Sequence, residues 1–300
     1  MRILLCSGIL LLLTLAVHAE LPATPAAATV AAGSTQPLDF NSEAQYLPLL
    51  DKTHVDGELI ELVQDGSSFR GIYCKDASGK PKGALLILNR HQGEPGWNTL
   101  RSTLQTTLAD HGWTSLAITL PPQTTDSKIL QGRIQIAQAY LVQQGQMNIA
   151  LLCYRTDCVG ASHYIADTAQ GSSQPPQAWI MLDAEDDNTT QDIPKTTTPQ
   201  TTATEKTTTE KAKSNTPAFL KAISKTAFPV LDLITSPRYH DAQQVRQRYV
   251  REQKWQAWQM VELPETPPGN VSGSLRTVSR IGGWLDKTTK GRSLNAPSGS

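Results

Sequence analysis

Three short stretches rich in apolar residues, each followed by a segment of helical spacing, constrain the fold of this chain most strongly. They are 84–88, 114–120 and 148–153. A strand that is apolar along its whole length is buried on both faces, as in a parallel sheet covered by helices. The loops between these strands and helices are short. The alternation therefore predicts an α/β protein with a mostly parallel sheet and helices on both of its faces.

The rest of the chain extends this pattern. Residues 55–63 and 67–75 read as two strands, which Gly66 can join as an N-terminal hairpin. Later strands are predicted at 178–182, 228–234 and 257–263. Helices are predicted at 97–111, 126–144, 158–168, 241–253 and 274–287. Because the carboxyl ends of parallel strands meet at one edge, the loops after the strands are where a functional site is expected.

The first nineteen residues have the pattern of a secretory signal peptide. Arg2 precedes an apolar run, and Val17-His18-Ala19 is a small-x-small cleavage site, so cleavage is expected after Ala19. An uncleaved anchor is the alternative, but the run is shorter than the roughly 20 residues that a spanning helix needs. We therefore expect an exported protein whose mature chain has no transmembrane segment.

Low-complexity segments divide what remains. Residues 20–41 form a disordered lead-in, residues 187–217 a low-complexity insertion, and residues 289–300 a flexible tail. Twelve of the 28 residues from Thr189 to Thr216 are threonine, a composition that buries too little apolar surface to offset the entropy of ordering. The expected domain is therefore built from two parts, 42–186 and 218–288, with the insertion between them.

Charge and cysteine content limit the partners and the chemistry. The 27 Lys and Arg residues balance the 27 Asp and Glu residues, which gives no reason to expect a nucleic-acid partner. No metal-ligand spacing and no phosphate-binding glycine loop is present, so neither a metal nor a cofactor is predicted. The mature chain would keep Cys74, Cys153 and Cys158. Export permits a disulfide, and proximity favours Cys153 with Cys158, although sequence alone does not choose the pair.

Several sequence blocks, taken in order, resemble the α/β-hydrolase fold. They are 83–88, 111–113 followed by 116–121, 148–152, 229–232 and 283–285. The chain resembles, more narrowly, an exported bacterial α/β-hydrolase-like family of unknown function, domain of unknown function 3530. The resemblance implies a Gram-negative source, and hence a periplasmic location.

The resemblance also implies a nucleophile on a sharp turn between a strand and a helix, with small residues two before and two after it. An ungapped alignment places Arg155 at the nucleophile position and Cys153 and Asp157 at the two small positions. Arginine stays protonated and cannot attack a carbonyl. Centring the turn on Thr156 instead puts Tyr154, which is too large, at a small position. Centring it on Cys158 is sterically better and would supply a thiolate near a helix N-terminus.

The rest of the implied catalytic apparatus is incomplete. The loop after the last strand should carry the histidine base, but no histidine follows His240. His240 and His91 are the candidates for a displaced base, and Asp241, or less favourably Asp232, for the carboxylate. Asp241 could instead cap the following helix. The loop that contains Arg90 and His91 is where the fold supplies an oxyanion-hole N–H. Arg90 and Trp97 are expected to line the pocket.

Three functional hypotheses follow. The first is a catalytically silent hydrolase-fold protein that binds a small molecule or an envelope protein. The second is an active ester or acyl hydrolase with Cys158 as a displaced nucleophile. The third is an envelope assembly or interaction protein that docks a partner through the Thr-rich insertion. The degenerate turn from Cys153 to Asp157, together with the missing histidine, favours the first hypothesis.

Overall fold

The computed structural model describes residues 56–90, 94–121, 127–170, 175–185, 220, 224, 229–265 and 270–289, all within one unit of the chain, Leu38–Ser300. The predicted signal peptide, lead-in, Thr-rich insertion and most of the tail lie outside these residues. Within the described ranges, no helix is long and apolar enough to cross a bilayer.

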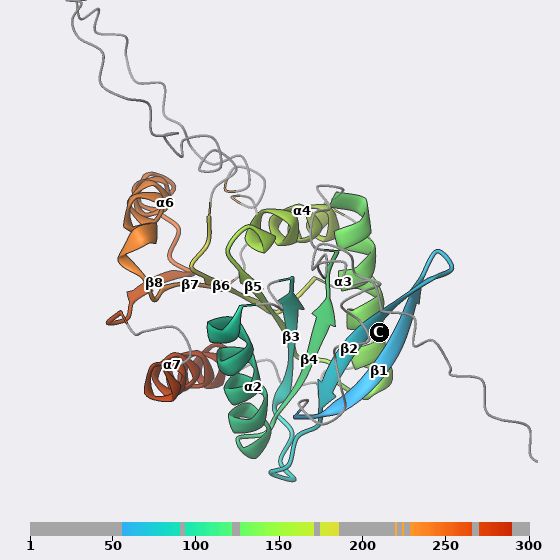
Figure 1. The fold of residues 1–300 in the computed structure, drawn as a ribbon. Coiled ribbons are helices and arrows are strands. Elements are labelled where there is room, and N and C mark those ends of the chain that lie inside the picture. The colour runs from blue at the N-terminus through green and yellow to red at the C-terminus, as the bar shows by residue number, and fades with distance from the viewer. Residues whose placement is uncertain are drawn as a thin grey trace, which may run out of the picture. The chain divides into compact units, whose positions relative to one another are not determined.

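An eight-stranded sheet in the order β1-β2-β4-β3-β5-β6-β7-β8 forms the centre of the molecule (Figure 1). The strands are β1 (Glu58–Gln64), β2 (Ser67–Cys74), β3 (Gly83–Asn89), β4 (Trp113–Thr119), β5 (Ile149–Tyr154), β6 (Ala178–Leu182), β7 (Val230–Ile234) and β8 (Trp258–Glu262). β1 and β2 pair as the predicted antiparallel hairpin, and β2 is antiparallel to β4. Every pairing from β4 through β3 to β8 is parallel, which confirms the predicted class of sheet.

Helices cover both faces of this sheet. They are α2 (Pro95–Asp110), α3 (Ser127–Gln143), α4 (Asp157–Gln170), α6 (His240–Glu252) and α7 (Val271–Thr289), with a short 3-10 turn η3 (Pro237–Tyr239) before α6. Figure 1 shows α2 and α7 on one side of the sheet and α3 and α4 on the other. Gly112 and Gly145, which follow α2 and α3, have φ values of 93° and 82°. Such left-handed geometry ends a helix at little cost for glycine.

The central strands are buried on both faces because their successive side chains enter two different cores. In β3, Leu86 and Leu88 belong to the core beneath α3 and α4, whereas Leu85 and Ile87 belong to the core beneath α2 and α7. Every residue of β3, β4 and β5 is buried. Burial of each large aliphatic side chain contributes about 1.5–3 kcal/mol, so these strands supply a rigid base for the loops that follow them.

Large aromatic side chains complete the two cores. Trp113, Trp179, Trp258 and Trp284 are all at most 8% exposed. Asp286 of α7 accepts a hydrogen bond from Trp113 Nε1 at 3.1 Å and pairs with Lys82 at 2.9 Å. These contacts fix α7 against the amino-terminal edge of the sheet. The amino-terminal end of α7 consequently lies at the opposite, carboxyl edge.

Candidate binding site at the carboxyl edge of the sheet

A cavity of about 380 Å³ opens at the carboxyl ends of β5, β6, β7 and β8. Its walls come from the start of α2, the ends of these strands and the start of α7. The lining residues are Glu94, Gly96, Trp97, Leu100, Tyr154, Arg155, Asp183, Thr235, Ser236, Arg238, Tyr239, Glu265, Asn270, Gly273, Ser274 and Thr277. The volume lies within the range of small-molecule sites.

Arg155 occupies the turn between β5 and α4 in a left-handed backbone conformation. β5 ends at Tyr154 and α4 begins at Asp157, so only two residues make the reversal. Arg155 has a φ of 51°, which lies in a backbone region that residues other than glycine, asparagine and aspartate rarely adopt. Its N–H donates to the carbonyl of Leu182 at 3.0 Å, which ties the turn to the end of β6. The turn between a strand and a helix where the resemblance led us to expect a nucleophile therefore carries an arginine in a left-handed conformation.

Asp157 lies where the resemblance led us to expect a small residue, and its carboxylate is held in an ion pair. Its side chain is fully buried, and Arg90 Nε donates to Asp157 Oδ1 at 2.5 Å. A carboxylate in the first turn of α4 is also favoured by the helix dipole. Arg90 was expected to line the pocket, and this expectation is corrected, because its guanidinium instead pairs with Asp157 and it is absent from the cavity walls.

The cysteines of the turn are joined. Cys153 and Cys158 form a disulfide, with their Cα atoms 5.0 Å apart, and both are fully buried. Cys158 therefore has no free thiol and does not line the cavity, so its assignment as a displaced nucleophile is corrected. Cys74 keeps a free thiol on β2, and burial raises the pKa of that thiol.

The guanidinium of Arg155 reaches across the cavity wall to the start of α2. Its Nη1 donates to Glu94 Oε1 at 2.6 Å, and its Cζ lies 4.7 Å from the centre of the Tyr154 ring and 5.9 Å from that of Tyr239. Burial alone would lower the pKa of Arg155, but Tyr154, Tyr239 and Glu94 raise it overall. Arg155, at the turn between β5 and α4 (the elbow), is thus a permanent cation.

Two aromatic side chains line the cavity next to the guanidinium of Arg155. Trp97 stacks on Tyr154 with ring centres 4.5 Å apart and planes 3° from parallel, and Trp97 Nε1 donates to Asn89 Oδ1 at 2.7 Å. Trp97 lies in the cavity wall, where the sequence placed it. Tyr154 also lies in the cavity wall, although we had considered it only as a residue too large for a small position of the turn. The stack holds the start of α2 against the end of β5.

Asp183 is the acidic residue that the sequence did not single out. It follows β6 with φ of 49° and is 4% exposed. Its Oδ1 accepts from the Thr235 N–H at 2.7 Å and its Oδ2 from the Thr235 hydroxyl at 2.6 Å. Burial raises its pKa, while the Thr235 hydrogen bonds and Arg155 oppose the rise. Asp183 therefore joins the ends of β6 and β7 at the cavity.

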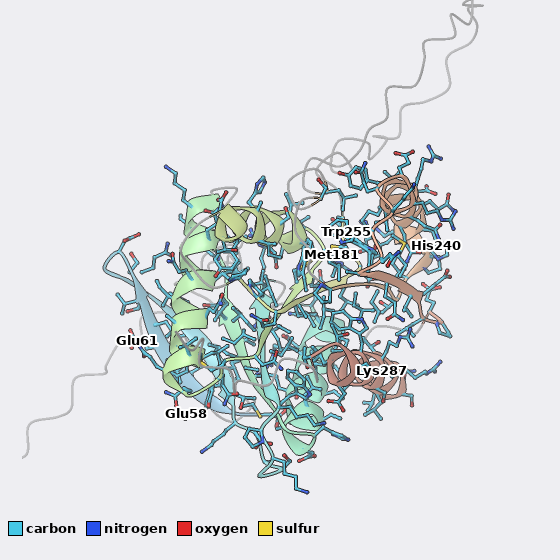
Figure 2. All side chains as sticks on the ribbon, turned by 180° about the vertical axis from the view of Figure 1, so that it is seen from behind. Glu58, Glu61, Met181, His240, Trp255 and Lys287 are labelled. Atoms are coloured by element: carbon cyan, nitrogen blue, oxygen red, sulfur yellow. A yellow bond between two sulfur atoms is a disulfide. The ribbon has the colours of Figure 1, made fainter. Side chains whose placement is uncertain are left out.

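The predicted base and carboxylate are not brought to the cavity. His240 begins α6 at the outer edge of the molecule (Figure 2), and its Nε2 lies 2.9 Å from Glu262 Oε1 of β8. Asp241 is exposed in the first turn of α6. Neither lines the cavity, so both assignments are corrected. His91 lies outside the described residues.

Asp232, the second carboxylate candidate, has a structural partner. It is fully buried in β7, where Arg246 of α6 donates through Nε at 2.7 Å and Nη2 at 3.1 Å. Arg246 Nη1 also donates to the Ala184 carbonyl at 2.9 Å. This pair fastens α6 to the sheet. Catalysis at the cavity would need a different carboxylate, and Asp183 and Glu265 are the ones present there on the later loops.

The family model described as "Protein of unknown function (DUF3530)" matches residues 1–131 and 122–287. This chain belongs to that family. No curated protein matches it.

Solved structures similar to this DUF3530 member are α/β hydrolases. Carboxyl esterase 2 of Tuber melanosporum is 11% identical with a TM-score of 0.53, over 80% of this chain and 89% of the esterase. Est1E of Butyrivibrio proteoclasticus is 13% identical with a TM-score of 0.52, over 77% and 99% of the two chains. A dienelactone hydrolase of Anabaena variabilis is 12% identical with a TM-score of 0.52, over 77% and 97%. These similarities establish the α/β-hydrolase fold.

The cavity of the DUF3530 chain thus lies where the fold places its chemistry, but with a different set of side chains. Its described lining residues include hydroxyls, carboxylates and two arginines, and neither a histidine nor a free cysteine. Among the residues that the structure describes, no group of three or more His, Cys, Asp or Glu side chains could hold a metal ion. Glu265 lies on the loop after β8, where the resemblance led us to expect a histidine.

Proposed function

We propose that this protein is a catalytically silent member of the hydrolase fold that binds a small molecule in the cavity at the carboxyl edge of the sheet. The observation that carries the proposal is Arg155 at the elbow, with a left-handed backbone and a guanidinium directed to Glu94. A group that remains protonated cannot act as a nucleophile or a general base, but it is well suited to hold an anionic or polar ligand.

The remaining hydroxyls of the cavity do not replace the nucleophile. A serine or threonine needs an adjacent base, most often a histidine that is itself oriented by a carboxylate. Thr235 instead donates its hydroxyl proton to Asp183, a direct contact in which no imidazole intervenes. The lining histidine is missing from the described walls, and the chain has no histidine after His240. These facts support binding without turnover.

The alternative of an active ester or acyl hydrolase rests on the similar esterases and dienelactone hydrolases. The disulfide argues against Cys158 as its nucleophile, because a bonded sulfur is not a thiolate. The second alternative, docking through residues 187–217, concerns a segment outside the described residues, and no observation favours it over binding at the cavity.

Ester hydrolysis by the purified mature protein is the direct test. We expect short-chain p-nitrophenyl esters to be hydrolysed at the rate measured in buffer alone, whereas enzymes accelerate their reactions by roughly a million-fold or more. Assays with and without reductant cover both states of Cys158. Turnover that a single substitution of the elbow, Arg155→Ala or Cys158→Ser, abolishes would refute the proposal.

We also propose that the protein is exported and acts in the periplasm, since the first nineteen residues have the pattern of a cleavable leader. Mass spectrometry of the protein recovered from its native envelope should give an N-terminus at Glu20. An intact leader in the mature protein would contradict this location.

A further inference from the structure

Two residues at the cavity carry hydrogen-bond donors that have no partner in the part of the chain that the structure describes. Arg155 uses Nη1 for Glu94, while its Nε is buried without a hydrogen bond and its Nη2 makes none to the described residues. The hydroxyl of Tyr239 is likewise buried and unpaired. Buried donors without acceptors are uncommon because they lose their hydration without compensation. Arg155 and Tyr239 therefore keep donors that the described part of the cavity wall does not satisfy.

The unpaired edge of Arg155 has the shape of a carboxylate receptor. Nε and Nη2 form the side-on fork that binds both oxygens of a carboxylate. Glu94 contacts Nη1, at the other end of the guanidinium, and no described side chain pairs with this fork. Burial raises the pKa of Tyr239 to about 12, so its hydroxyl remains a donor at neutral pH. Arg155 and Tyr239 both line this cavity.

The charges of the lining restrict the anion. Arg155 and Arg238 face three carboxyl groups, those of Glu94, Asp183 and Glu265. A doubly charged phosphate would meet more repulsion here than a singly charged carboxylate. The three carboxyl groups would in turn accept hydrogen bonds from hydroxyl or ammonium groups elsewhere on the ligand. Asn270 and Ser274, at the start of α7, add further polar partners.

We infer that the cavity binds a small carboxylic acid bearing hydroxyl or ammonium groups, whose carboxylate is received by the Nε–Nη2 fork of Arg155. This inference rests on the proposed binding function and names its ligand class. In the free protein, Glu94 holds the guanidinium in place. Because Glu94 also neutralises part of its charge, it weakens the attraction for an incoming carboxylate.

Two pairs of probes separate the carboxylate from the rest of the ligand. Gluconate and gluconamide carry the hydroxyl groups, and the dipeptide Ala-Ala and its amide carry the ammonium group. Titration of the mature protein by calorimetry or NMR at low salt should show at least one acid binding on the order of tenfold or more tightly than its amide. The pair in which the acid binds more tightly than the amide shows whether the cavity prefers a ligand with hydroxyl groups or one with an ammonium group.

Variants of Arg155 and Glu94 test whether the acid binds at the guanidinium of Arg155. Arg155→Met should weaken the preferred acid by about tenfold to a hundredfold, and Arg155→Lys by less. Arg251→Met is the matched control, because Arg251 is exposed in the last turn of α6 and should leave affinity unchanged. Glu94→Gln should tighten binding by roughly threefold, a gain of the size of one partly exposed ion pair. Glu94 makes no side-chain capping bond to α2, so its substitution should not disturb that helix.

Each contrary outcome has a definite meaning. Equal binding of acids and amides, or unchanged affinity in both Arg155 variants, would overturn the carboxylate inference and leave the binding function standing. Failure of both acids to bind at millimolar concentration would also overturn it. Ester turnover by the same preparation would instead refute the proposed function. If Arg155→Met does not fold, the opposite shifts expected for Arg155→Lys and Glu94→Gln decide the matter.

Discussion

The guanidinium of Arg155 lies 2.6 Å from the carboxylate of Glu94, although the two residues are 61 positions apart in the chain. Their pairing joins the elbow after β5 to the first residue before α2, the same two segments that the Trp97–Tyr154 stack holds together. The side chain at the elbow is thus part of the cavity wall. It is partly exposed, at 25%, so a ligand in the cavity could contact it.

The left-handed backbone of Arg155 predicts an order of stability among its variants. Glycine at this position relieves strain of about 1 kcal/mol, alanine retains it, and β-branched valine increases it. The variants should therefore rank Arg155→Gly, Arg155→Ala and Arg155→Val in decreasing stability, with roughly 1–2 kcal/mol between the first and the last. All three lose the contact with Glu94 equally. Urea unfolding measures the order, and a valine variant as stable as the glycine one would contradict it.

The cysteines give a prediction about labelling. In the mature, oxidised protein only Cys74 has a free thiol, and burial raises its pKa. Iodoacetamide should therefore modify one site per chain, slowly at neutral pH because little thiolate is present. Reduction in denaturant should raise the number to three. Mass spectrometry of the labelled peptides reads both results, and rapid labelling of Cys158 in the native protein would refute the assignment.

The same disulfide predicts a modest contribution to stability. Cys153 and Cys158 are five residues apart, so the bridge closes a short loop, and the chain-entropy model assigns such a loop about 2 kcal/mol. The double variant Cys153→Ala/Cys158→Ala should unfold at lower denaturant concentration by that amount and keep the native circular dichroism. Cys74→Ala serves as the control for loss of a cysteine outside the bridge.

The sequence predicted the sheet more completely than it predicted the site. Strands such as 84–88 and 148–153 are buried on both faces, so their apolar runs were unambiguous, and the elbow followed from where β5 ends. The site, by contrast, depends on side chains from distant segments. Glu94, Asp183 and Tyr239 look like ordinary loop residues until the parallel strands bring their ends together. Cys158 suggested a nucleophile because the sequence alone does not show which cysteine it pairs with.

Asp232 and Arg246 form a buried ion pair, and we expect replacement of either residue alone to destabilise the protein. Both side chains are fully buried, so Asp232→Asn or Arg246→Met alone leaves one charge without its counterion, at a cost of about 3–5 kcal/mol. The double variant Asp232→Leu/Arg246→Met removes both charges and should recover much of that loss. Guanidinium unfolding of the three variants tests this coupling. A double variant whose loss equals the sum of the two single losses would show that the pair is not coupled.

Asp183 predicts how stability depends on pH. Burial raises its pKa in the folded protein above the ordinary value of 3.8, so the folded state binds a proton that the unfolded state has released. The stability that this proton provides is fully present below pH 3.8 and is lost as pH rises through the raised folded pKa. Asp183→Asn cannot titrate and keeps an oxygen for one Thr235 hydrogen bond. The difference in unfolding free energy, wild type minus variant, should therefore fall as pH rises from about 4 towards neutrality. Asp241→Asn, an exposed carboxylate on α6, is the control and should leave the wild-type profile unchanged. A difference that stays constant across this window would mean that Asp183 is ionised throughout it.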